Sequence, residues 1–541
     1  MTIGKEFTEP LINGELNPPP ITPAVFTIAE NYIAVTRPLS DGLGNNPVSH
    51  DPEEKATSQW VWGEVREQCW LAGPIMVMYM LHYIMAMAAT IYVGHLGSFP
   101  LAAVTLANTF CSLTGFTVLA GLSSALETLC GQAYGAKQYH LLGIYLQRAA
   151  FFLTVCAAVP IALIWLNMER ILVAMGQDPE IAHAAHTYAF WLYPILILYS
   201  IFFPVIKFFQ TQGAVFELMV CSAMTVLFHV PLCWFIIDKL NVGYKGAALA
   251  TNISMLIDLS FCFAFIRFSP RFEKTFSSFS WDAFQELGEF FSLALPSATM
   301  MCLEHWSFEI LTFLAGVLPN SKLNISSFAI CMGLLSLANM TTLAFGSATS
   351  VRVSNELGAG KAHSARLVVA VSVALGIVYG CVMASLIYSL RDVWGWAFTN
   401  DFEVVNHVAH DAPHLAILAI LYGIGAILSG VVRGIGFQRT GAIANLGAYY
   451  AIGLPVAFIS VFVFRSDSWG LWLGMGCGLV IQVICFMYII LCTSWDQLAE
   501  EAMLRSLSFD SRLPILAPPV TKPLLEDSRS LEDNQRFSTQ S

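Results

Sequence analysis

The sequence predicts an all-α membrane protein in which twelve transmembrane helices form two pseudo-symmetric six-helix lobes. The chain of 541 residues is strongly apolar: 56% of the residues are hydrophobic, only 12% are charged, and the mean hydropathy is +0.64. Soluble domains contain about 25% charged residues. Apolar segments long enough to cross a bilayer, about 17–25 residues each, follow one another along the chain. The second half of the chain also repeats landmarks of the first half, which predicts two related lobes.

Twelve apolar segments account for most of the chain between residues 69 and 493. They lie near 70–93, 101–124, 148–168, 186–208, 215–237, 246–267, 290–315, 325–347, 366–389, 408–432, 442–464 and 469–493. A polar segment separates the sixth from the seventh, so the spans divide into six and six.

This division predicts five parts of the chain. Residues 1–68 are polar and rich in Pro and Asn, and we expect a disordered cytosolic tail. The N-lobe then covers 69–267, a cytosolic linker covers 268–289, and the C-lobe covers 290–493. Residues 494–541 form a second cytosolic tail, which begins with a helix-capping pattern after Ser494.

The distribution of basic residues predicts the orientation in the membrane. An even number of spans in each lobe places both chain ends on one side, and the connections on that side hold 11 Lys and Arg against 6 on the other. Cytosolic connections carry the excess of basic residues, so we expect both termini in the cytosol.

The internal repeat aligns two helices that differ at one position. Pro74 and His82 recur 222 residues later as Pro296 and Glu304. A carboxylate near the centre of a bilayer costs about 2.5–3.5 kcal/mol on insertion scales, so it marks a functional site by default. Removal from water favours the protonated form of a carboxylate. We therefore predict that Glu304 couples proton movement; the alternative is a glutamate that only links packed helices.

Polar neighbours of Glu304 extend this candidate site. Glu309 is a second proton-coupling candidate, and it lies four residues after His305 on the same helical face, which favours a pair between them. We expect a cavity lined by five candidates: His82, Tyr83, His305, Asn339 and Tyr449. A single histidine such as His82 on an apolar helix is more often a packing residue than a functional one.

Matched prolines and charges near the predicted cytosolic ends form a candidate gate or hinge. Pro74 and Pro296 each remove one backbone donor and permit a bend. Glu127, Arg352 and Glu356 lie in matched polar segments that follow the second span of each lobe. We expect these charges to pair across the lobes.

The sequence lacks the motifs of nucleotide-driven pumps, hydrolases, metalloproteases and nucleic-acid-binding proteins. It contains no GxxxxGK[ST] phosphate loop, no GxSxG or HExxH motif, and no basic patch of the kind that nucleic-acid binding requires. The 13 Cys form no CxxC pair or metal-ligand spacing. We expect no enzyme activity, no cofactor, no metal and no nucleic-acid partner, and we expect a monomer.

Several segments together resemble the multidrug and toxic compound extrusion (MATE) family in its plant branch. The matching stretches, within residues 70–493, are VGHLG, GLSSALETLCGQAYGAKQYHLLGIYLQRA, CLEHWSFEILTFLAGVLPN, SVRVSNELGAG, ILSGVVRGIGFQ and GAYYAIGLPVA. The resemblance implies a twelve-helix bundle that alternates access by rocking, and it identifies Glu304, in CLEHW, as the protonation site of the second lobe.

Two positions depart from the family pattern. Many plant members have Asp in the tenth helix shortly before the LSG stretch, where this chain has Gly423. Bacterial and archaeal members often have an acid in the first helix, whereas the nearest ionisable residue here is His82. These departures predict that the first lobe holds no carboxylate site and that one proton moves per solute.

The resemblance implies a proton-coupled antiporter that exports organic solutes, either plant secondary metabolites or xenobiotics, from the cytosol. The partners would be the solute, H⁺ and the lipid bilayer, and the location either the vacuolar membrane (tonoplast) or the plasma membrane. Two alternatives remain open: a twelve-helix uniporter from outside the MATE family, and a membrane sensor or scaffold that does not transport.

Overall fold

The computed structural model describes residues 52–276, 279–315, 318 and 321–510, and these residues form helices without any strand. Eleven helical segments within them are long and apolar enough to cross a membrane. The twelfth is α13 (Leu287–Ala315), which has the length of a span. Its polar residues, among them Glu304 and Glu309, lower its hydropathy relative to the other eleven. The predicted all-helical membrane fold is confirmed.

The six spans of the N-lobe contain several short π-helical or kinked joints. In chain order they are α2 (Pro52–Gly94); α3 (Ser98–Cys111), η1 (Ser112–Phe116), α4 (Thr117–Ser123) and α5 (Ala125–Gly135); α6 (Tyr139–Phe152), η2 (Leu153–Ala158) and α7 (Val159–Leu166); α9 (Pro179–Leu192) and α10 (Pro194–Thr211); α11 (Val215–Cys233) and η3 (Trp234–Lys239); and α12 (Tyr244–Phe268). The short α8 (Met168–Ala174) connects the third span to the fourth.

The C-lobe repeats this order of six spans. They are α13; α14 (Ser321–Gly358); α15 (Ala362–Ser389); α17 (Phe402–Gly434); α18 (Gln438–Asn445), η7 (Leu446–Gly453) and α19 (Leu454–Phe462); and α20 (Asp467–Leu491). Short α16 (Arg391–Trp394) and η6 (Gly395–Ala397) precede α17, and α21 (Trp495–Asp510) follows α20.

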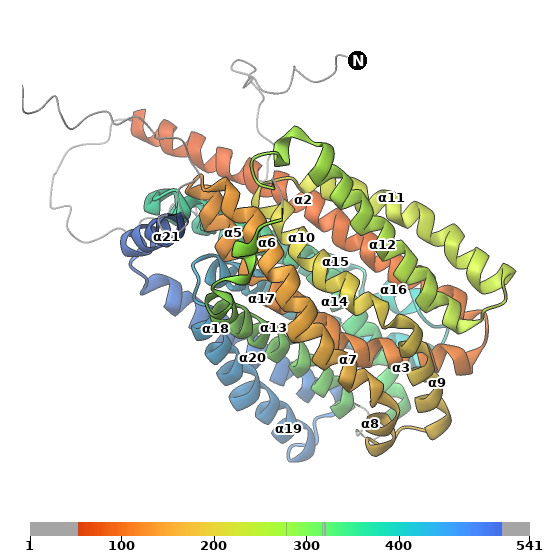
Figure 1. The fold of residues 1–541 in the computed structure, drawn as a ribbon. Coiled ribbons are helices and arrows are strands. Elements are labelled where there is room, and N and C mark those ends of the chain that lie inside the picture. The colour runs from red at the N-terminus through yellow and green to blue at the C-terminus, as the bar shows by residue number, and fades with distance from the viewer. Residues whose placement is uncertain (1–51, 277–278, 316–317, 319–320, 511–541) are drawn as a thin grey trace, which may run out of the picture.

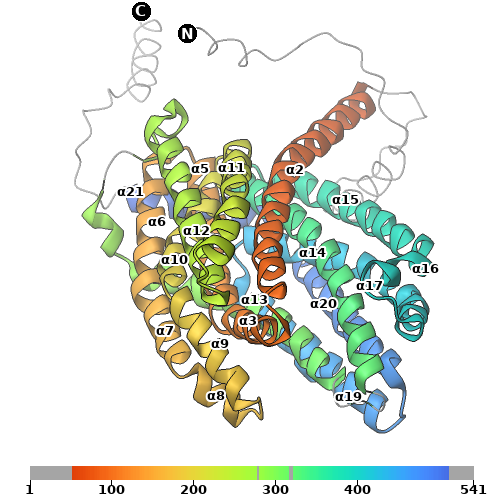
Figure 2. The ribbon, with the colours of Figure 1, turned by 90° about the vertical axis from the view of Figure 1, so that its right-hand side faces the viewer.

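The two lobes lie beside each other, with α2 extending from one towards the other. In Figure 2 the orange and yellow helices of the N-lobe lie to the left, and the teal and blue helices of the C-lobe lie to the right. Helix α2 packs against α11 and α12 of its own lobe and also against α14 and α15 (Figure 1). We call the side on which α2 begins and α14 ends the tail side.

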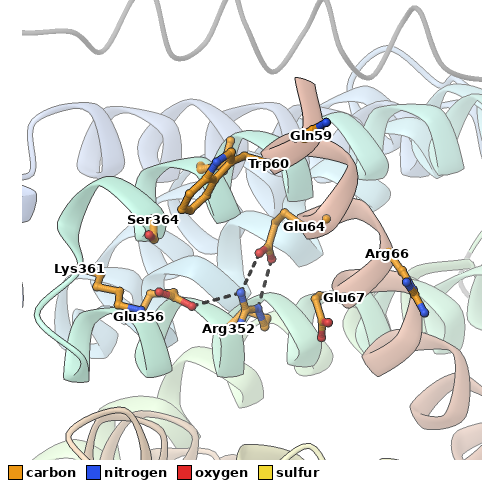
Figure 3. Close-up of a pocket in the computed structure, with 11 residues that line it drawn as sticks. Gln59, Trp60, Glu64, Arg66, Glu67, Arg352, Glu356, Lys361 and Ser364 are labelled. Carbon is orange, nitrogen blue, oxygen red and sulfur yellow. Dashed lines mark hydrogen bonds and ion pairs between the residues drawn. The ribbon is translucent and has the colours of Figure 1, made fainter. Parts of the chain in front are cut away.

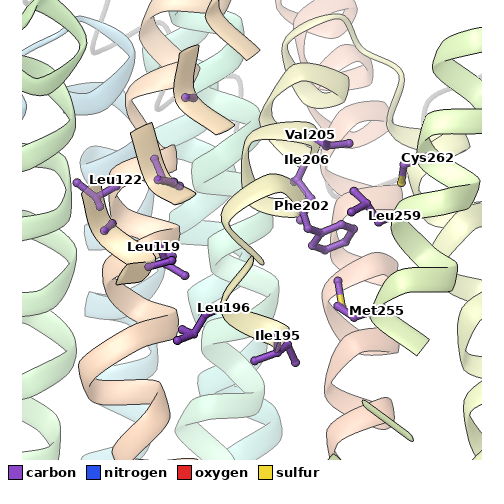
Figure 4. Close-up of a cluster of buried hydrophobic side chains, with 14 of the residues drawn as sticks. Leu119, Leu122, Ile195, Leu196, Phe202, Val205, Ile206, Met255, Leu259 and Cys262 are labelled. Carbon is purple, nitrogen blue, oxygen red and sulfur yellow. The ribbon is translucent and has the colours of Figure 1, made fainter. Parts of the chain in front are cut away.

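The N-lobe core is one large apolar cluster, which continues into the C-lobe through Ala294 and Ala298 of α13 and Ala344 and Ala348 of α14. Figure 4 shows part of the N-lobe core, where Phe202 of α10 lies beside Leu259 of α12; Leu119 of α4 belongs to the same buried cluster. The C-lobe contains two further clusters, one around Trp472 and Phe328 and one around Phe486. The lobes are therefore in apolar contact through α13 and α14, while most of each core packs within its own lobe.

The first helix begins earlier than the sequence indicates. Residues 52–68 were expected to belong to the disordered tail, but they form the first turns of α2. The charges of this stretch suggested a solvated tail, yet Val61 is buried against Leu367 of α15 and Glu64 bonds to Arg352. Tertiary contacts therefore extend the helix. Residues 1–51 and 511–541, expected to be disordered, lie outside the described residues.

The connection between the lobes packs against the N-lobe. It contains η4 (Pro270–Phe272) and η5 (Trp281–Phe284). The buried Arg148 of α6 donates to the backbone oxygen of Asp282 at 3.1 Å, and the Phe272 ring stacks on Phe208 at 5.8 Å. The segment that the sequence predicts as a linker is thus fixed to one lobe at the tail side.

Candidate functional site

Glu304 lies in α13, the first helix of the C-lobe, where its side chain is partly exposed. Its Oε2 accepts a hydrogen bond at 3.1 Å from Nε2 of Gln482, which lies in α20, the last helix of the same lobe. Gln482 is buried, with 1% of its surface exposed. Glu304 is therefore held from one side by the lobe and is accessible from the other.

A buried polar network fixes the orientation of Gln482. The same Nε2 donates to Oδ1 of Asn445 at 3.0 Å, and its Oε1 accepts from the hydroxyl of Tyr449 at 2.9 Å. Asn445 in turn donates to the backbone oxygen of Met300 at 2.9 Å. Because both amide hydrogens and the oxygen of Gln482 are engaged, its N–H must point at Glu304.

Aromatic rings border this network. The ring of Phe308, one helical turn after Glu304, lies 5.4 Å from that of Tyr422 and 5.7 Å from that of Tyr449. All three side chains are buried in the C-lobe core, so they supply apolar packing around the polar centre. Tyr449 is a predicted cavity residue that the structure brings to Glu304; Tyr422 was not predicted.

The structure explains why this chain has no acid at Gly423. Glycine at this position lies against the backbone of α15, and a Cβ there would approach the backbone oxygen of Gly376 within 2.8 Å. Gly380, also in α15, contacts the same place. The close packing of α15 on α17 leaves no room for a larger side chain with this backbone.

The remaining predicted residues on α13 do not form the expected pair. His305 and Glu309 are both partly exposed, and in the described part of the chain no hydrogen bond or ion pair joins them. The spacing of four residues puts them on one helical face, but it does not fix their rotamers. An exposed pair contributes about 0.2–1 kcal/mol, too little to hold two long side chains together.

Two further cavity candidates, Asn339 and Tyr83, have surroundings that differ from those of Glu304. Asn339 of α14 accepts a local hydrogen bond from Thr342 at 3.2 Å. Tyr83 of α2 is 37% exposed. Within the described ranges, neither forms a hydrogen bond with the Glu304 network, so their role as cavity residues stays a prediction.

The N-lobe contains a carboxylate that the sequence did not indicate. His82 contacts Asp258 of α12, with Nε2 3.1 Å from Oδ2. The sequence predicts that the first lobe holds no carboxylate site, and that stays a prediction; the structure places a buried carboxylate beside His82. Asp258 is 176 residues away along the chain, so only the packing of α2 on α12 brings the two together.

Two ion clusters, one buried and one partly buried, join the lobes at the tail side. Glu127 of α5, 1% exposed, accepts from Lys207 Nζ at 2.5 Å within its own lobe and from Arg433 Nε at 3.0 Å across the lobes. Thr128 strengthens this contact by donating to the backbone oxygen of Arg433. We call the residues Glu127, Lys207 and Arg433 the ion triad.

The second ion cluster centres on Arg352 of α14. Its guanidinium donates to both carboxylate oxygens of Glu64 in α2, at 3.2 and 2.7 Å, and lies 3.1 Å from Glu356 in its own helix. Figure 3 shows this arrangement in a groove of about 480 Å³, where Lys361 also lies. A bidentate arginine–carboxylate pair is strong and directional.

The expectation of charges that pair across the lobes is therefore correct for Glu127 and Arg352, but their partners differ from the expected ones. The missed partners are Glu64, which we placed in the tail, and Arg433, which we counted only as a loop charge. Pro74 and Pro296, the expected hinges, lie inside α2 and α13.

Glycines bring α5 and α14 together between these clusters. A Cβ on Gly358 would clash with the backbone oxygen of Gln132, and one on Gly135 would clash with that of Asn355. The C-terminal α21 adds a further link, because Arg505 donates to Oε1 of Gln132 at 3.0 Å. The lobes are thus in direct contact along their tail side.

We expect Gly358→Ala to weaken this closure, because its methyl group must push the backbones of α14 and α5 apart. Overpacking of this kind costs about 1–3 kcal/mol. Gly288→Ala is the matched control: a Cβ there meets nothing within 4 Å. The thermal unfolding midpoint of the purified protein should fall in the first variant and stay the same or rise in the second. An equal midpoint in both would contradict the close approach.

Two six-helix lobes that meet on one side, with a carboxylate in the first helix of one lobe, define a transporter of the two-lobed, internally repeated class. The chain belongs to the MATE family. The family model MatE matches twice, over residues 74–235 and 296–459, and the two matches start at the prolines that the sequence repeat aligns.

Curated relatives and solved structures agree with this assignment. The chain is 42% identical to Protein DETOXIFICATION 16 of Arabidopsis thaliana over 448 residues, which cover 83% of this chain and 92% of the relative. DETOXIFICATION 17 of the same plant is also 42% identical, over 460 residues that cover 85% of this chain and 96% of the relative. The crystal structure of the eukaryotic MATE transporter AtDTX14 superimposes with a TM-score of 0.79 at 36% identity, covering 83% of this chain and all of that one.

Proposed function

We propose that this MATE transporter is a proton-coupled antiporter that exports organic solutes from the cytosol by alternating access. The observation that carries the proposal is Glu304: a carboxylate within the span α13, held by the buried Gln482 and bordered by aromatic rings. A group of this kind can bind a proton in one conformation and release it in the other.

The contacts between the lobes support a state in which the tail side is closed. The ion triad, the Arg352 cluster and the glycine contacts all lie on that side. With both termini in the cytosol, as the sequence predicts, we infer that this state is closed to the cytosol and opens to the other side. Protons from the acidic outer side then protonate Glu304, and solute and proton compete for the lobe that carries it.

The proton gradient supplies enough energy for useful export. One pH unit is worth about 1.4 kcal/mol per proton, and 100 mV is worth about 2.3 kcal/mol per charge. One proton per cycle can thus support a solute gradient of some tens to hundreds. A single chain contains both lobes, so a monomer suffices.

The proposed substrates are plant secondary metabolites or xenobiotics, exported into the vacuole or out of the cell. The plant DETOXIFICATION relatives support this class. Membership of the MATE family excludes the alternative of a uniporter from another family. The other alternative, a membrane sensor or scaffold that does not transport, is one possible outcome of the experiment below.

Transport against a gradient tests the proposal. Purified protein is reconstituted in vesicles with an acidic interior, and a defined mixture of flavonoids, alkaloids and organic acids is supplied outside. We expect mass spectrometry to detect at least one compound concentrated inside, and a protonophore to abolish the accumulation. Equilibration that does not respond to the pH gradient would indicate a uniporter, and no uptake of any compound would indicate a sensor.

Glu309→Gln should reduce coupled transport less than Glu304→Gln does. In the part of the chain that the structure describes, Glu309 forms no hydrogen bond with the network that holds Glu304, so its neutralisation should cost at most about tenfold in rate, or about 1.4 kcal/mol. Initial uptake rates in the same vesicles measure this. A loss equal to that of Glu304→Gln would show that the two carboxylates act as one site.

A further inference from the structure

A polar pair in the N-lobe occupies the position that corresponds to Glu304 in the C-lobe. His82 lies in α2 at the place where the internal repeat has Glu304. Its Nε2 is 3.1 Å from Oδ2 of Asp258 in α12. The Asp258 side chain is fully buried, whereas that of His82 is 21% exposed. The carboxylate is thus shielded from water, and the imidazole connects it to accessible space.

The two lobes build this contact in the same way. In each lobe, a group on the first helix bonds to a group on the last: His82 to Asp258, and Glu304 to Gln482. The separations along the chain are 176 and 178 residues. The pairs are therefore related by the internal repeat, with the acid on the first helix in one lobe and on the last helix in the other.

The hydrogen bonds of His82 require a proton within the pair. Its Nδ1 is 3.0 Å from the backbone oxygen of Met78, which can only accept, so Nδ1 carries a hydrogen. A neutral ring with this tautomer has only a lone pair at Nε2, and an ionised Asp258 has only acceptors. The contact between Nε2 and Oδ2 then needs one more proton, either on the ring or on the carboxyl group.

The surroundings give Asp258 little other compensation. Ser222 of α11 donates to Oδ2 at 3.4 Å, while the buried Oδ1 has no hydrogen-bond partner among the residues that the structure describes. The other titratable groups that face the carboxylate are the phenol of Tyr199 in α10 and the thiol of Cys262 in α12. No lysine or arginine among the described residues forms an ion pair with Asp258. A buried carboxylate without a counter-charge is costly, so the proton on the pair is what balances it.

We propose that His82 and Asp258 form a proton-binding site in the N-lobe, separate from Glu304. The step is a simple release: one proton passes from the pair to water through the exposed edge of His82, which leaves a neutral imidazole beside a carboxylate, and rebinding restores the contact. The chain then holds two protonation sites, one in each lobe. In the proposed antiporter, which this last point presupposes, two protons rather than one would move per solute.

The protonation state of His82 can be measured without any substrate. The full chain is labelled with ¹³C in the histidine rings and placed in lipid nanodiscs, and the His82 signal is assigned by its loss in His82→Gln. The carboxylic acid band of Asp258 is followed by infrared spectroscopy, with Asp258→Asn as the reference. Between about pH 5 and pH 9, we expect the wild type to show a proton on the ring or on the carboxyl group that is lost as the pH rises.

Two variants distinguish a proton-binding pair from a buried histidine that only packs and forms hydrogen bonds. Asp258→Asn, nearly the same size, should leave the His82 ring neutral at pH 7. His229→Asn is the matched control, because His229 is a buried N-lobe histidine whose Nδ1 contacts Ser254 at 2.8 Å rather than a carboxylate. It should leave the His82 signal unchanged.

Three results would overturn the proposal. One is an unprotonated pair at every pH in this range, and another is a pair that never releases its proton. The third is loss of the titration in Glu304→Gln, which would show one shared site rather than two. The titration does not depend on transport, so it stands if the chain fails to move solutes in vesicles.

Discussion

Glu304→Gln is expected to reduce uphill export to the level of empty vesicles while expression and membrane insertion persist. The amide keeps the size of the carboxylate. It can still contact Gln482, whose Nε2 donates to Glu304 Oε2 at 3.1 Å in the wild type. It cannot bind and release a proton in the physiological range. The fold should therefore survive, and only the coupling should be lost. Uptake in vesicles with an imposed pH gradient measures the effect.

Gln482→Leu provides a second test of the same centre. This change removes the donor to Glu304 and leaves Asn445 and Tyr449 without one of their partners. A buried polar group left unpaired costs about 1–3 kcal/mol, so this variant should lose stability as well as coupling.

Undiminished uphill transport in Glu304→Gln would reject Glu304 as the coupling residue.

Glu127→Gln is expected to have the largest effect on the tail-side closure. It removes the charge that both Lys207 and Arg433 contact, in a place where Glu127 is 1% exposed. Removing one partner of a buried ion pair typically costs about 3–5 kcal/mol, because the remaining charge is left uncompensated. The closed state should lose much of its stability, and the tail side should open more often.

Reaction of Cys130 with a membrane-impermeant maleimide measures this opening. Cys130 lies three residues after Glu127 and is fully buried, so mass spectrometry of its peptide should detect little labelling in the wild type and more in Glu127→Gln. Glu217→Gln is the matched control, because it breaks the exposed pair of Glu217 and Arg271 at 3.1 Å, which is worth at most about 1 kcal/mol. Equal labelling in all three proteins would argue against the ion triad as a gate.

The sequence was sufficient for much of the fold because a bilayer constrains it strongly. Every spanning segment must satisfy its backbone hydrogen bonds internally, so apolar length alone predicts helices, and the repeat of Pro74 as Pro296 predicts two lobes. The start of α2 was missed because residues 52–68 carry charges. Glu64 among them pairs with Arg352 of the C-lobe, and local composition contains no sign of that.

The candidate site also contains residues that the sequence predicts and residues that it does not. Glu304 was predictable because a carboxylate inside an apolar span is costly, and Glu127 and Arg352 because they stand in matched polar segments. Their partners were not predictable, since Gln482, Arg433 and Glu64 each come from a helix far away along the chain. The expected pair of His305 and Glu309 failed for a related reason: helical spacing fixes a face but not a side-chain conformation.

By itself, the sequence determined that this protein is a duplicated bundle of membrane helices with a carboxylate in its seventh span, since hydrophobic length and the cost of a buried charge are local properties. Only the tertiary structure decided which charges meet across the lobes, why Gly423 admits no acid, and that His82 has Asp258 as its partner. These contacts join residues more than 40 positions apart, and it is the packing of whole helices, rather than any local pattern, that sets the distances between them.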